Sequence, residues 1–227
     1  MARDRDDEFL MTALEESQQR VAALDVSDGT RPWVDTANEL LQSASQAFKE
    51  LVEREDLEEL EARQALQVMR EAKRTLDKTF HEVIANLDIV LGKSRLAPDA
   101  NREQQMALAH FISRFHQGEF ESLRTRAAVK TADEALGFLQ EYEPSSQAAS
   151  ALEAAIDALE SAREAAGDEG AEAVEAYGEL VEGRSVARVC YLTARDLVSA
   201  SLRFEARHEE LDTIIPPISD ILKVGFN

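Results

Sequence analysis

The chain is poor in cysteine and has no long apolar run. Its 227 residues include one cysteine, Cys190, which excludes an internal disulfide and a zinc site built from several cysteines. No stretch approaches the ~18–20 apolar residues that a transmembrane helix needs, so membrane insertion is not expected. The segment Met1–Glu8 lacks the apolar core of a secretion signal, and we therefore expect a cytoplasmic protein.

Basic residues are also scarce. Lys and Arg total 25 against 45 Asp and Glu, so the net charge is 25 − 45 = −20. Such a charge repels phosphate backbones, and aromatic residues, at 6%, offer no platform for stacking bases. Direct nucleic-acid binding is therefore not expected. An acidic decoy that presents DNA-like charge to a nucleic-acid-binding protein remains an alternative.

Only 5 Pro and 9 Gly interrupt the chain, and good helix formers fill the stretches between them. Apolar residues recur every three or four positions, as in the run Val34, Ala37, Leu41, Ala44 and Phe48. No segment alternates apolar and polar residues as a half-buried strand would. The pattern predicts an all-α protein, an antiparallel bundle of about six or seven helices.

Turn signals divide this pattern into helices. The charged run 53–59 is either a short break or part of one very long helix, whereas Gly167–Gly170 predicts a break. Pro216 and Pro217 are expected to end the last long helix. A linker near residue 96 predicts two halves, 1–95 and 96–227, packed as one domain. Residue pairs matching at an offset of 125 suggest two related three-helix halves, although chance produces such matches in this composition.

Two residue pairs on the long helices have the spacing of carboxylate–histidine metal ligands. Glu205 and His208 form a Glu-x-x-His motif, which places both side chains on one face of a helix. Asp77 and His81, four residues apart, hold a corresponding place in the first half. A chain so rich in Glu also generates such spacings by chance, so these four residues are candidates only.

The C-terminal segment from Ile214 is apolar and interrupted by Pro-Pro, whereas frayed tails are usually polar. It is expected either to fold back on the bundle or to dock on a partner. The candidate interaction residues are Ile218, Ile221, Leu222, Val224 and Phe226.

The run Trp33–Asn38, followed by Phe48, Leu51, Arg54 and Ala62-Arg63, resembles a pattern in uncharacterised bacterial all-helical proteins. In such proteins, similar stretches close a helical repeat. The resemblance covers about a quarter of the chain. It implies a helical bundle and brings no activity or site.

The sequence contains no Gly-rich phosphate loop, nucleophile elbow or His-Glu-x-x-His motif, so no cofactor is predicted and catalysis is not expected. Long amphipathic helices and an apolar tail favour a structural, adaptor or self-associating protein that binds a protein partner or a second copy. A metal-binding bundle centred on the two carboxylate–histidine pairs is an alternative.

Overall fold

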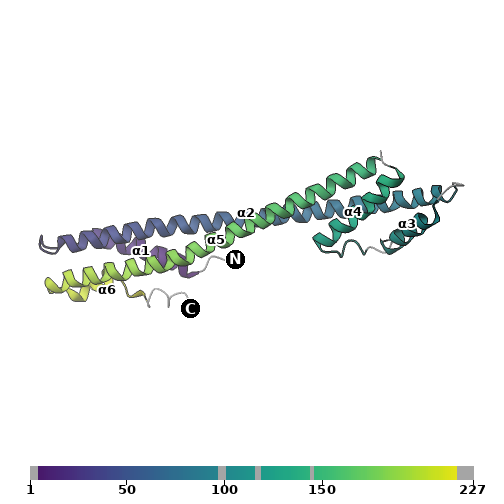
Figure 1. Cartoon of the computed structure of the whole chain (residues 1–227). Coiled ribbons are helices and arrows are strands. Elements are labelled where there is room, and N and C mark those ends of the chain that lie inside the picture. The colour runs from purple at the N-terminus through teal and green to yellow at the C-terminus, as the bar shows by residue number, and fades with distance from the viewer. Residues whose placement is uncertain (1–4, 97–100, 116–118, 144–145, 219–227) are drawn as a thin grey trace. The chain divides into compact units, whose positions relative to one another are not determined.

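The computed structural model describes residues 5–96, 101–115, 119–143 and 146–218. Within these ranges the chain is helical without any strand, which confirms the predicted all-α bundle (Figure 1). None of the described helices is long and apolar enough to cross a membrane. The helices are α1 (Arg5–Ala22), α2 (Arg31–Ser94), α3 (Arg102–Phe115), α4 (Thr125–Tyr142), α5 (Gln147–Phe204), the 3-10 helix η1 (His208–Glu210) and α6 (Leu211–Ile214).

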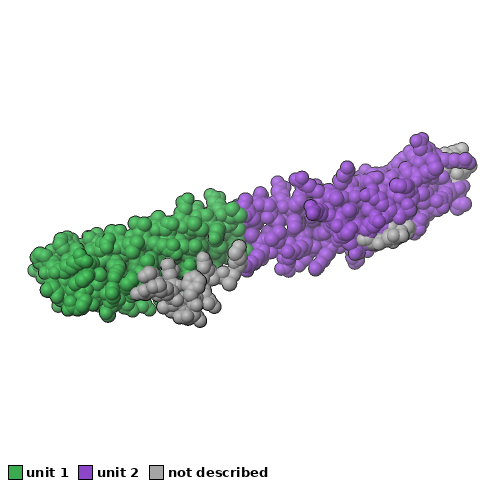
Figure 2. All heavy atoms as spheres, turned by 90° about the horizontal axis from the view of Figure 1, so that it is seen from below, with its two compact units in different colours: residues 1–59, 172–227 green, residues 60–171 purple. Residues whose placement is uncertain are grey.

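The chain divides into two compact units (Figure 2). Unit 1 comprises residues 1–59 and 172–227, and unit 2 comprises residues 60–171. This division differs from the predicted halves 1–95 and 96–227. The physical reason is that α2 and α5 are each long enough to contribute residues to both units.

Unit 1 is built around an antiparallel pairing of α2 and α5. At one end, Thr30 just before α2 lies beside Glu205 just after α5. Further along, Arg54 of α2 forms an ion pair with Glu179 of α5. The apolar stripe of α2 that the sequence predicted, from Val34 to Phe48, is buried here with residues of α1, α5 and α6.

Unit 2 has a separate core, formed by α2, α3, α4 and the first part of α5. Five phenylalanines contact one another in this core, and the rings of Phe80, Phe111 and Phe115 each contact three others. The five are Phe80, Phe111, Phe115, Phe120 and Phe138. Unit 2 therefore has its own aromatic core.

Helix ends follow the sequence in some places and depart from it in others. Asn101 and Ser146 cap α3 and α5 by accepting hydrogen bonds from the backbone N–H groups of Glu103 and Ala149. The charged run 53–59 lies within α2. The break predicted at Gly167–Gly170 is wrong, because α5 continues through it. A helix-interior glycine costs only about 1 kcal/mol, and α5 is held in place by the buried residues on either side of this segment, in the cores of unit 2 and unit 1.

Candidate functional site

The predicted Glu-x-x-His motif does not lie on one helix. α5 ends at Phe204, before Glu205, and His208 begins η1. Ala206 has a φ of 58°, the left-handed conformation, and the backbone N–H of Arg207 donates to the carbonyl of Leu202 at 2.8 Å. This is the pattern of a Schellman C-cap. The prediction that Glu205 and His208 share a helical face is wrong, because the chain reverses between them.

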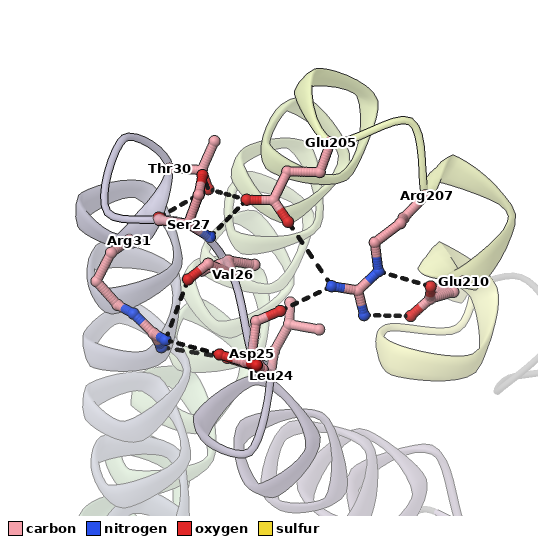
Figure 3. A network of polar contacts seen from close by, with 9 residues as sticks. All are labelled: Leu24, Asp25, Val26, Ser27, Thr30, Arg31, Glu205, Arg207 and Glu210. Atoms are coloured by element: carbon pink, nitrogen blue, oxygen red, sulfur yellow. Dashed lines mark hydrogen bonds and ion pairs between the residues drawn. The ribbon is translucent and has the colours of Figure 1, made fainter.

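Glu205 instead forms hydrogen bonds with the segment that connects α1 and α2 (Figure 3). Its carboxylate accepts a hydrogen bond from the backbone N–H of Ser27 at 2.7 Å, and the Thr30 hydroxyl lies 2.6 Å from the same oxygen. These hydrogen bonds stabilise the charged form and lower the pKa of Glu205 to about 2, with the Thr30 contact as the largest cause. The side chain is therefore a structural anion at the end of unit 1.

Arg207 extends the same network (Figure 3). Its guanidinium donates two hydrogen bonds of 2.7 Å to the carboxylate of Glu210, and a third, also of 2.7 Å, to the backbone carbonyl of Asp25. The Arg207 contact lowers the pKa of Glu210. Together, Glu205 and Arg207 bind the end of α5 to the chain just after α1.

The second candidate pair, Asp77 and His81, lies on α2 in unit 2. Asp77 forms an ion pair with Lys73, and Nδ1 of His81 is 2.7 Å from the backbone carbonyl of Asp77. His81 Nε2 is 3.8 Å from Glu121. Within the described ranges, neither pair belongs to a group of three close ligating side chains. Hydrogen bonds and ion pairs therefore account for Glu205, Asp77 and His81.

The described part of the C-terminal segment folds back on unit 1. Ile214 and Ile215 are buried in its core, and Ile218 packs against that core while partly exposed. The buried Tyr191 donates a hydrogen bond to the carbonyl of Pro216 at 2.9 Å, and Arg20 donates to that of Thr213 at 3.1 Å. The fold-back expectation therefore holds through Ile218. The candidates Ile221, Leu222, Val224 and Phe226 lie outside the described residues.

One face of α5 in unit 1 carries an apolar stripe that the described residues leave exposed. Its side chains are 40% to 73% exposed, whereas the opposite side of the helix, from Leu180 to Leu202, is buried in the core. At about 100° per residue, all of them fall within about 60° of Val174 around the helix axis. We call the following residues the α5 stripe: Val174, Tyr177, Val181, Val189 and Leu192.

Two further residues complete this face. Beyond its own helix backbone and chain neighbours, Gly178 has nothing within 4 Å of the position that a Cβ would take, so the helix surface is open there. Arg188 is partly exposed on the same face. The face therefore offers apolar side chains, an open stretch of helix and a guanidinium.

Comparisons with protein-family models, with curated proteins and with solved structures find no match to this chain. Its resemblance to uncharacterised bacterial helical proteins stays a prediction.

Sequence reasoning missed a second surface, a row of basic side chains on α2 in unit 2. Its members are all exposed and are spaced by seven, four, four and three residues, which keeps them on one helical face. Glu71, Asp77 and Glu82 border the row. The helical spacing of these residues can be read from the sequence, but the net charge of −20 gives no sign of a local basic surface. The row consists of Arg63, Arg70, Arg74, Lys78 and His81.

Proposed function

We propose that this chain is a non-enzymatic helical-bundle protein that acts by binding another protein through the α5 stripe. The observation that carries the proposal is the contrast between the two sides of α5 in unit 1. One side completes the core, and the stripe on the other side exposes five apolar residues to solvent. Contiguous exposed apolar surface of this kind is typical of interaction sites.

The size of the stripe is consistent with this role. Its exposed fractions correspond to about 500 Å² of surface, within the ~300–600 Å² of the largest patch on an ordinary monomer, which is often functional. Covering it would contribute about 12 kcal/mol of hydrophobic free energy at ~25 cal/mol per Å². Because association itself costs about 4–15 kcal/mol, the stripe favours reversible rather than permanent binding.

The alternatives have less support from the described residues. A metal centre would require Glu205 and Asp77 to give up the hydrogen bonds and ion pair that they already form. An acidic decoy would require carboxylates on its exposed faces, but α2 presents the basic row from Arg63 to His81. Neither role makes use of the α5 stripe.

Site-specific photo-crosslinking in cells that express the protein tests the proposal. A photoreactive residue is introduced in place of Val174 or Leu192, which lie on the centre line of the stripe. Val186 is the matched control, because it is 61% exposed on the same helix but lies about 120° away from Val174. We expect protein adducts at 174 and 192 in several-fold excess over 186. Equal yields at all three positions would refute a binding role for the stripe.

A further inference from the structure

We propose that the partner of the α5 stripe is a second copy of this chain, bound antiparallel about a two-fold axis that crosses the stripe face at the height of residue 183. This inference rests on the proposed function, since it names the occupant of the same surface. The two copies form an isologous dimer, in which each copy contributes the same stretch of α5 to the interface.

The charge distribution along α5 favours a second copy. Between residues 172 and 182 the helix carries four glutamates and no basic residue. Between 184 and 203 it carries four arginines and a single acidic residue, Asp196. An antiparallel pair therefore places the acidic half of each copy against the basic half of the other, whereas a parallel pair places like charges together. Such local complementarity offsets the repulsion between two chains that each carry a net charge of −20.

Some of these charges are already used within unit 1. Glu179 pairs with Arg54, Arg184 with Asp7, and Arg195 with Asp212. The remaining glutamates are exposed, as is Arg203, and Arg188 is partly exposed on the stripe face. The remaining glutamates are Glu172, Glu175 and Glu182. Glu175 and Glu182 lie about 80–100° from Val174 around α5, so they contribute their charge at the edge of the stripe.

The side-chain register also closes on itself. With the axis at the height of residue 183, a residue of one copy faces a residue of the other copy when their two numbers add up to about 366. Val174 then faces Leu192 of the second copy, and Val181 faces Ser185, so that residues on the centre line of the stripe meet residues on the same line.

The same register gives Arg188 a place to bind. Its counterparts across the axis are Tyr177, which is half exposed, and Gly178, where the backbone is open. Arg188 and Tyr177 lie on the same side of the stripe's centre line, so the guanidinium would stack on the ring of Tyr177 of the second copy. By symmetry this contact occurs twice in the dimer.

The available area sets the expected strength. Two copies of the stripe amount to about 1,000 Å², which is the lower bound for a specific interface before flanking side chains are added. We therefore expect a reversible dimer whose population depends on concentration.

Light scattering on the purified full-length chain measures the dimer directly. We expect the mass to rise from 25.2 kDa toward twice that value as concentration increases through the micromolar range. Val174→Glu, which places two new charges at the interface, should keep the mass at that of the monomer, and Val186→Glu should leave the dimer intact. A monomer at every concentration, or a dimer that survives Val174→Glu, would overturn the proposal.

Distances between spin labels test the orientation. Labels are attached at Ser185→Cys or Thr193→Cys in a Cys190→Ala background. At 1.5 Å per residue and about 10 Å between helix axes, the antiparallel dimer predicts about 10 Å between the two labels at 185 and about 30 Å at 193. Equal short distances at both positions would refute the antiparallel arrangement. If purified protein stays monomeric while Val174 crosslinks another protein in cells, the dimer fails and the proposed function stands.

Discussion

Ala206 lies in the C-terminal cap of α5, and replacing it with glycine should stabilise the protein. Its φ of 58° lies in the left-handed region, which costs an L-residue about 1–2 kcal/mol. Glycine removes that cost but adds freedom to the unfolded chain, which takes back about 0.4–1 kcal/mol. Ala206→Gly should therefore raise the free energy of unfolding by about 1 kcal/mol. With an m-value of about 1–3 kcal/mol per M, the urea midpoint should rise by about 0.3–1 M.

Ala200→Gly is the matched control, because Ala200 is exposed on α5 and lies within the helix, six residues before Ala206. There the same substitution should lower the free energy of unfolding by about 1 kcal/mol. Urea unfolding followed by circular dichroism compares the two variants under identical conditions. The reasoning would be refuted if Ala206→Gly lowered the midpoint as Ala200→Gly does.

Three further perturbations test individual contacts. The pKa of Glu205 is lowered from 4.5 to about 2, so its contribution to stability is present above pH 4.5 and is lost as the pH falls toward 2. The Tm difference between wild type and Glu205→Gln should therefore shrink over that range. A constant Tm difference would count against the hydrogen-bond network. Tyr191→Phe removes the hydrogen bond to Pro216 and should lower the free energy of unfolding by about 1–2 kcal/mol. Amide exchange in residues 211–215 should become faster, and unchanged exchange there would contradict the contact. Phe80→Ala should lower the free energy of unfolding by about 3–5 kcal/mol. It should speed amide exchange more in α3 and α4 than in α1, whereas an equal loss of protection in all three helices would argue against separate cores.

The fold was largely predictable because it depends on a repeated local signal. The three-to-four spacing of apolar residues such as Val34, Leu41 and Phe48 places them on one helical face, and all three are buried. The end of α5 was not predictable in the same way. Ala206 adopts a conformation that usually signals glycine, so the sequence around Glu205 and His208 reads as an uninterrupted helix.

The surfaces were harder to predict than the core. Tyr177 and Leu192 follow the same spacing as buried residues, and only the packing of unit 1 determines which stripe of α5 faces inward. The basic row from Arg63 to His81 was hidden by the overall acidity, because net charge carries no information about position. For the tail, the apolar composition correctly favoured folding back as far as Ile218.

The central claim is that the α5 stripe binds protein, and the size of the chain in its own cell extract tests it most directly. Size-exclusion chromatography at native abundance compares wild type with Val174→Glu and Val186→Glu, which differ only in which face of α5 receives the charge. The account predicts that wild type and Val186→Glu elute together as a larger species and that Val174→Glu elutes later. If all three proteins elute at the same volume, the stripe is not an interaction surface and the account is wrong.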